Sequence, residues 1–421
     1  SKALKFDYNA TNEGRILEPY GAIDTREKKD TIKQNLKGFG ENVTFRQAFN
    51  INYNVPINKI PILDFASLSY RYEGKYTWSR RPFAVVDSMN IGNTIQNTNT
   101  QNYTGTFNMI SLYNKIPYFK RINSGQSKAG KGLKGNEKNN APVDSNKTES
   151  FKNSDNFKDI GEFLARAVMM IKNVSVTYQL TNGTGLPNFR PSSQYMGMDW
   201  RDGENMAPGL GFIAGSQEDI RPKALANGWL TLAEFQTTPY TRMKTENKTY
   251  RASIEPHGSL KIELNGTQNK SYNLTEFMRW DPITQRYEFH DTPNETGNFS
   301  TSIFSLGRSF KDKGNDVESE LFKDFIRTRQ DYARELSSKN PNSNGEYQYY
   351  DISGKLRTGF DGYSETQQDV LIGTFYETYS GKKIKNYSTR NMFPGFPLPN
   401  WTVTWDGLGK LKVFKKMFRG I

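Results

Sequence analysis

The stretch ASLSYRYEGKYTWSR, residues 66–80, alternates between two kinds of side chain. One parity carries apolar and aromatic residues, namely Leu68, Tyr70, Tyr72, Tyr76 and Trp78. The other parity carries polar and charged residues, namely Ser69, Arg71, Glu73, Lys75 and Thr77. Because successive side chains of a strand point to opposite faces, this pattern predicts a strand with one apolar face and one polar face exposed to water. The predicted strand is also much longer than the usual five or six residues or so.

The same two-residue period returns at several places along the chain. Within a predicted strand at 43–57, the apolar residues Phe49, Ile51, Tyr53 and Val55 alternate with asparagines, and apolar residues at 174, 176, 178 and 180 repeat the scheme. Residues 250–254 and 260–264 read as two strands joined by a tight turn at 256–259, and residues 401–405 as a last short strand. We expect five polar residues to share one water-facing surface that lines a lumen: Asn50, Asn52, Asn54, Ser175 and Thr177.

The composition favours strands that cross a membrane over a large dry core. Hydrophobic residues make up 35% of the 421 residues, aromatic residues 13%, and the mean hydropathy is −0.78. No stretch approaches the roughly 18 uncharged apolar residues of a transmembrane helix, so a crossing would need strands of about 9–11 residues. The sequence predicts an all-β fold, an antiparallel transmembrane β-barrel segment with short helices in loop or cap insertions. A soluble β-sandwich is the alternative, since its strands also have one wet face.

A short motif recurs where a strand is expected to end. Asn-Lys-Ile-Pro occurs at 58–61 and again at 114–117, and a looser copy begins at 409. Proline fixes φ and cannot donate to a strand ladder, so each copy should end a strand and begin a compact turn with its own apolar plug. Chance similarity of short amphipathic turns remains the alternative. The residues of these strand corners are Lys59, Ile60, Pro61, Lys115, Ile116, Pro117, Lys410 and Leu411.

Amino-acid composition and hydrophobic periodicity divide the chain into five segments. Residues 1–121 are expected to form barrel strands with short corner turns, and residues 122–158 a flexible low-complexity loop. Residues 159–310 should contain a helix and then barrel strands and hairpins. A helical loop or cap insertion should follow at 311–395, and a barrel strand with a basic corner at 396–421.

Three helices are predicted within these segments. The first covers about 158–170, and the second covers about 317–336 with Asn315 as its cap. The third follows Ser364, because Ser364 and Gln367 match a capping box. Gly381 is expected to end this helix, since glycine tolerates the left-handed conformation of a helix C-terminus.

The net charge of +13 suggests an anionic partner. Residues 381–421 hold nine Lys and Arg against one acid, Asp406, but they match no nucleic-acid-binding motif. Contact with lipid phosphates or simple solubility explains the charge, and we expect no nucleic-acid partner. The first residues, SKALKF, lack the features of a signal peptide, so we expect the chain to be part of a longer one.

Residues suited to catalysis or metal binding are sparse. The chain has no cysteine and only two histidines, His257 and His290. It therefore has few of the residues that histidine metal sites and Ser-His-Asp catalysis require. The oxygen-rich run 291–298 lacks the spacing of an EF-hand, which makes calcium binding a minor hypothesis. A carboxylate pair for glycoside hydrolysis stays open, because its members can lie far apart in sequence. We expect no enzyme activity, no cofactor and no metal.

Five phrases, in this order along the chain, resemble the SprA/Sov family of outer-membrane translocons of type IX secretion in Bacteroidota. They are YNVPINKIP at 53–61, LYNKIP at 112–117, NVSVTY at 173–178, ANGWLT at 226–231, and PLPNW at 397–401 followed by WDGL. The resemblance spans nearly the whole chain. It implies a very large single-chain barrel in the outer membrane of a Gram-negative bacterium, of which this chain would be an internal fragment.

The resemblance also implies a function and partners. Folded client proteins would cross a wide aqueous lumen, and a PorV-like shuttle, plug proteins and outer-membrane lipid would contact the barrel. The family is also linked to gliding motility, and it has no catalytic residues. Two alternatives remain open, namely another outer-membrane transporter such as a TonB-dependent receptor, and a soluble β-rich carbohydrate-binding protein or hydrolase. The second would present an exposed platform of Trp200, Trp229 and Trp401.

Overall fold

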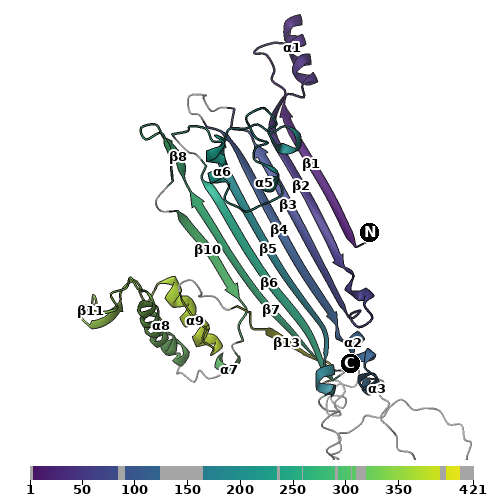
Figure 1. The fold of residues 1–421 in the computed structure, drawn as a ribbon. Helices are drawn as coiled ribbons and strands as arrows, with labels where there is room; N and C mark the ends of the chain where they lie inside the picture. Colours follow the sequence, from purple (N-terminus) through teal and green to yellow (C-terminus); the bar gives the residue numbers. More distant parts are fainter. Residues whose placement is uncertain are drawn as a thin grey trace, which may run out of the picture.

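The computed structural model describes residues 3–83, 91–123, 165–234, 238–257, 259–289, 293–304, 306–309, 319–388 and 395–407. One antiparallel sheet of nine strands dominates the fold (Figure 1). Its strands are β1 (Leu4–Arg15), β2 (Glu41–Val55), β3 (Ala66–Ser79), β4 (Asn93–Asn108), β5 (Ile171–Phe189), β6 (Tyr240–His257), β7 (Leu260–Glu276), β10 (Asn294–Thr301) and β13 (Asn400–Trp405). From β1 to β7 they lie side by side in chain order, and β10 and β13 pair with different halves of β7.

This arrangement confirms the predicted antiparallel β-architecture and excludes one alternative. The other strands of the described residues form two ribbons, β8 (Met278–Asp281) with β9 (Arg286–Phe289), and β11 (Glu346–Tyr350) with β12 (Leu356–Phe360). A two-sheet sandwich therefore does not occur in the described part of the chain. Within that part the large sheet is open, with β1 at one edge and β10 and β13 at the other.

The strand register sorts side chains onto two faces, because residues directly opposite each other in an antiparallel pair share a face. One row of opposed residues contains Leu4, Tyr53, Tyr70, Tyr103 and Tyr178. We call the face that carries this row the apolar face. A neighbouring row on the other side contains Asn54, Ser69, Thr104, Thr177, Thr249 and Thr267. We call that side the polar face.

The periodic stretches of sequence predicted these strands well. The expected strands at 43–57 and 66–80 correspond to β2 and β3 within two residues at each end. The stretch at 173–180 lies inside β5, and the expected hairpin around 256–259 joins β6 to β7. The last short strand is β13, which pairs with β7.

Short helices lie beyond both ends of the sheet (Figure 1). Helix α1 (Arg26–Lys37) joins β1 to β2 at one end, which we call the cap end. At the opposite corner end are η1 (Pro56–Lys59), α2 (Met109–Lys115) and α3 (Pro117–Asn123). Residues 165–169 are helical and lead into β5, whereas 158–164 of that predicted helix lie outside the described residues. Of the predicted loop at 122–158, only the last two residues of α3 are described.

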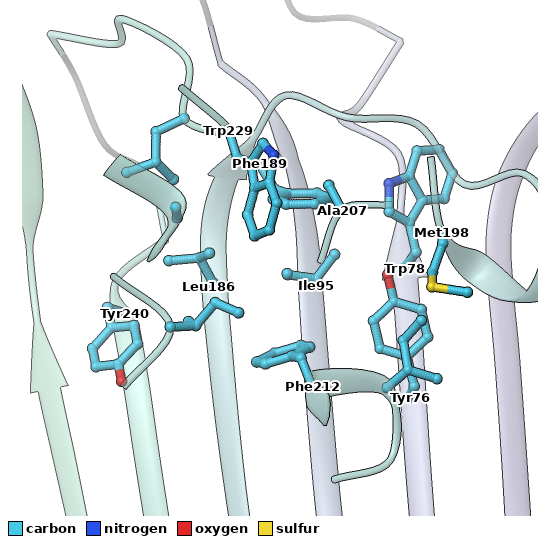
Figure 2. Packing of buried hydrophobic residues seen from close by; sticks show 14 of the residues in the cluster. Tyr76, Trp78, Ile95, Leu186, Phe189, Met198, Ala207, Phe212, Trp229 and Tyr240 are labelled. Carbon is cyan, nitrogen blue, oxygen red and sulfur yellow. The ribbon is translucent and has the colours of Figure 1, made fainter. Parts of the chain in front are cut away.

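Residues 190–234 form a cap that covers the apolar face at the cap end. They contain η3 (Tyr195–Gly197), α5 (Leu210–Ile213) and α6 (Arg221–Ala226). Figure 2 shows strand side chains such as Tyr76, Ile95 and Leu186 meeting cap side chains such as Phe212 and Trp229. Trp229 is fully buried, which makes it the largest completely enclosed side chain of this core.

A second, smaller unit follows the sheet. It consists of α7 (Leu306–Ser309), α8 (Glu320–Lys339), the β11–β12 hairpin and α9 (Gln368–Ser380), and it lies beside the β10 edge (Figure 1). Its core contains Tyr332, Ala333, Leu336, Phe360, Tyr363, Val370, Tyr376, Ile384 and Tyr387.

The helix limits in this unit differ slightly from those predicted. Ser319 caps α8 through its side chain, and the predicted cap Asn315 lies outside the described residues. The N-cap of α9 is Gln367, whose Oε1 accepts from the Ser364 N–H at 3.2 Å, so half of the predicted capping box forms. Gly381 ends α9 in the left-handed conformation, as predicted, with a φ of 71°.

Candidate functional site

The polar face is the first element of the candidate site. The structure places all five predicted residues on it, namely Asn50, Asn52 and Asn54 of β2 and Ser175 and Thr177 of β5. Asn54 and Thr177 lie in the same row, although 123 positions separate them in the sequence. The row that contains them is uncharged across six strands, so this part of the face presents only small hydrogen-bonding groups to water.

Several charged side chains on the polar face are paired with neighbours on the same face. Lys75 lies 3.1 Å from Glu73, and Lys261 lies 2.6 Å from Glu263. Toward the corner end this face borders a hollow of about 740 Å³, lined by small polar residues that include Ser67, Thr106, Ser175, Ser253 and Asn265. The face is therefore hydrated and nearly neutral, without a strong attraction for one class of ligand.

The second element is an apolar band on the opposite face, between the cap and the corner end. It has no charged member, and many of its side chains are exposed, including Phe6 at 62% and Val176 at 42%. An exposed apolar patch that spans eight strands indicates contact with lipid or with another protein. The band consists of Leu4, Phe6, Tyr8, Phe49, Ile51, Tyr53, Leu68, Tyr70, Tyr72, Tyr103, Phe107, Val174, Val176, Tyr178, Leu180, Tyr250, Ala252, Ile254, Leu260, Ile262, Leu264, Trp401, Val403 and Trp405.

The two close copies of the corner motif adopt the same backbone conformation. Lys59 and Lys115 end short helices, and the following Ile60 and Ile116 are extended with φ/ψ of −84°/116° and −89°/113°. This conformation follows from the next residue, since proline disfavours a helical residue before it. In both copies the isoleucine N–H donates to a carbonyl three residues earlier. The two copies are therefore similar in structure as well as in sequence.

The two corners also contact each other. The Lys115 ammonium lies 2.5 Å from an Asp64 carboxylate oxygen and donates to the Pro61 carbonyl. The predicted apolar plug is wrong in one respect, because Ile60 and Ile62 are exposed and enclose no core of their own. Lys410 and Leu411 of the looser copy lie outside the described residues.

Polar residues on the apolar face anchor the cap. Asn97 donates through Nδ2 to the carbonyls of Phe212 and Ser216, at 2.8 and 2.9 Å. Asn99 donates to Gly215 O at 2.6 Å, and the Tyr72 hydroxyl donates to Ala214 O at 2.6 Å. Sequence reasoning missed these residues. The available signal was the run of amides at 97, 99 and 101 on the parity that should have been apolar.

Two ion-pair clusters hold the chain of the cap in place. Burial raises the pKa of Asp199, but bonds from the Arg201 guanidinium and the Ser192 N–H outweigh this effect and hold the pKa at about 2. The hydrogen bond with Asp219 raises the pKa of Arg221, which also pairs with Glu276 at the end of β7. These charges stay paired at neutral pH, and they fasten the cap without forming an open reactive centre.

The described residues offer little for catalysis or metal binding. No group of three or more His, Cys, Asp or Glu side chains among them is arranged to hold a metal ion. Residues 294–298 of the oxygen-rich run belong to β10, while 291–292 lie outside the description. The tryptophan platform of the carbohydrate-binding alternative is wrong, because Trp229 is fully buried in the cap core.

The described helices are short or polar. None of those in the described ranges is long and apolar enough to cross a membrane. No known protein family and no curated protein sequence matches this chain.

Proposed function

We propose that this chain forms part of the wall of a large transmembrane β-barrel in the outer membrane of a Gram-negative bacterium of the Bacteroidota. The barrel is a passive channel that exports folded client proteins, like the type IX translocons that the sequence resembles. The apolar band faces lipid and the polar face lines the water-filled lumen. The chain contributes no reaction chemistry to this role.

The observation that carries the proposal is the slant of the apolar band. Toward the cap end the band starts at Tyr8 on β1 and at Trp401 on β13. Tyr8 lies in the row of Asn99 on β4, whereas Trp401 lies in the row of Phe107, eight residues further along that strand. Most strands between them follow the same trend, with limits at Phe49, Tyr72, Tyr103, Tyr250 and Leu264. Only β5 departs from it, since its limit, Leu180, lies opposite Gln101, two residues nearer the cap end than Tyr103.

This slant matches the tilt of strands in a membrane barrel. Eight residues of about 3.3 Å each give roughly 26 Å along a strand, and seven steps between strands of about 4.8 Å give roughly 34 Å across the sheet. The border of the band is therefore inclined by about 38° to the rows of hydrogen bonds, and strands of outer-membrane barrels tilt by about 35–45°. A patch that served a compact protein partner has no reason to follow this angle.

The open edges of the sheet also support a larger barrel. In the described residues β1 pairs only with β2, and β10 and β13 pair only with β7. Strand edges cannot remain unpaired in hydrocarbon, because each free N–H and C=O group there costs several kcal/mol or so. Further strands therefore pair with these edges in the assembled barrel.

The partners follow from the resemblance to type IX translocons. They are secreted client proteins inside the lumen, a PorV-like shuttle and plug proteins, and outer-membrane lipid around the wall. The hydrated, nearly neutral polar face supports this role, because a channel for many different clients must not bind any of them tightly.

Fluorescence quenching by lipid tests the proposed orientation. We expect brominated phosphatidylcholine to quench the tryptophan fluorescence of the chain in bilayers, because Trp405 lies inside the apolar band and is 49% exposed. Trp405→Phe should remove part of this quenching, and Trp401→Phe a similar part, since both lie in the apolar band. Trp200→Phe is the matched control, since Trp200 is similarly exposed, at 47%, but lies in the cap. If none of these variants changed the lipid quenching, or only Trp200→Phe did, the orientation would be wrong.

A further inference from the structure

A group of cations lies on the apolar face at β6 and β7. Arg242, Lys244 and Lys248 lie at alternate positions of β6 and therefore point to one side of the sheet. Lys270 of β7 stands directly opposite Glu246, which places it on the same side. We call Arg242, Lys244, Lys248 and Lys270 the basic cluster.

The basic cluster is only partly neutralised. Lys244 lies 2.9 Å from Glu246, Arg242 donates to the Gln217 carbonyl at 3.1 Å, and Lys248 donates to the Gly395 carbonyl at 3.4 Å, a neutral partner that leaves its charge in place. Glu295 of β10, opposite Leu274, and Glu276 of β7, opposite Tyr240, are further carboxylates on this part of the face. Asp219 of the cap also interacts with Arg242, while Arg221 pairs with both Asp219 and Glu276. Five cations therefore face four carboxylates, and a small surplus of positive charge remains.

The cluster is confined to one part of the sheet. In the three rows from Lys244 to Lys248, the apolar-face residues of β1 to β5 are all uncharged, and most are aromatic or aliphatic. Lysine and arginine are costly on the lipid face of a barrel near the bilayer centre, and their cost falls almost to zero at the interface. A local cluster of this kind therefore belongs at the level of the headgroups.

The slanted border of the apolar band places it there. On β6 the band starts at Tyr250, so Lys248 is the next residue toward the cap on the same face, and Glu246 with its partner Lys270 follows. Along a tilted strand these positions rise about 5 and 10 Å above the border. The polar region of one leaflet is about 5–8 Å thick, which long lysine side chains can easily reach.

We propose that the basic cluster binds the phosphate groups of membrane lipids at the cap-side border of the apolar band. The inference rests on the proposed function, because it requires the apolar band to face lipid. Charge complementarity selects the ligand, since phosphate is the group that a bilayer presents at this height. The neighbouring Tyr272 supplies an amphipathic ring of the kind that is common at this level.

Spin-labelled lipids test the inference. The full chain is placed in phosphatidylcholine bilayers that contain a small amount of spin-labelled phosphatidic acid or spin-labelled phosphatidylcholine. The fraction of each label immobilised by the protein is measured by electron spin resonance. We expect a preference for phosphatidic acid, and the double variant Lys248→Gln/Lys270→Gln should reduce it by about fivefold or more, because each surface lysine attracts anionic lipid.

The control variant removes equal charge from the other face. Lys75→Gln/Lys261→Gln changes two lysines of the polar face and should leave the preference unchanged. If the chain without substitutions immobilised both labels equally, the basic cluster would not be a phosphate site. The proposed role as part of a barrel wall would still stand. Equal loss in both double variants would also overturn the phosphate site, since net charge alone would then explain the preference. If neither label were immobilised, the proposed function itself would fail.

Discussion

Arginine in place of Val176 is expected to lower the free energy of unfolding of the chain in bilayers by about 2–4 kcal/mol. Val176 lies near the middle of the apolar band and is 42% exposed, so the guanidinium would have to leave water for hydrocarbon. No carboxylate of the apolar face lies in its row or in the next row toward the corner end, so the charge cannot be neutralised there.

The adjacent residue supplies a matched control. Thr177 belongs to the uncharged row of the polar face, where an arginine would meet water, so Thr177→Arg should change stability by less than about 1 kcal/mol. Urea titration of both variants in phosphatidylcholine bilayers measures the difference. Equal destabilisation by the two arginines would show that both faces have the same surroundings, which the proposed wall does not allow.

Trp229→Ala is expected to destabilise the cap by about 3–5 kcal/mol. The indole is fully buried, packs against Phe189 and donates through Nε1 to the Glu204 carbonyl at 3.1 Å. Truncation would open a cavity beneath residues 190–234 and remove one of the two hydrogen bonds that this carbonyl accepts, the other coming from the Ala207 N–H. Hydrogen exchange of the cap amides measures the effect, because exchange should accelerate there first.

Trp200→Ala is the control for this change. Trp200 is about half exposed and its Nε1 donates to the Tyr195 carbonyl at 2.9 Å, so its loss should cost about 1 kcal/mol or less. Unchanged exchange rates in Trp229→Ala would contradict the packing of the cap on the apolar face. The strands themselves should stay protected in both variants, because their ladders do not depend on the cap.

The strands were predictable because their side chains alternate over long stretches. The pattern at 66–80 is visible without knowledge of any partner strand, and β3 forms there. Two helices were also predictable, since α8 has an apolar side and α9 ends at a glycine in the left-handed conformation. The register was not predictable. Rows that unite Asn54 with Thr177 depend on the lengths of intervening connections, which local periodicity does not encode.

The cap and α1 were missed for different physical reasons. Helix α1 has no buried residue, so it carries no apolar stripe to detect. The sequence of the cap shows no hydrophobic periodicity, because the cap consists largely of turns, with Met196, Asn205 and Met206 at positive φ. Its core exists only through contacts with strands far away in sequence. Asn97 and Asn99, which bind the cap, were therefore not identified from the sequence.

Single-cysteine accessibility tests the central claim, that one face meets lipid and the other meets water. The chain has no cysteine, so a thiol at each position reports on that position alone. We expect a water-soluble maleimide to label Asn52→Cys and Thr404→Cys in bilayers at least about tenfold faster than Ile51→Cys and Val403→Cys, because the reactive thiolate is disfavoured in hydrocarbon. All four should react alike in urea. Equal rates in bilayers, or faster labelling at Ile51→Cys and Val403→Cys, would contradict the account.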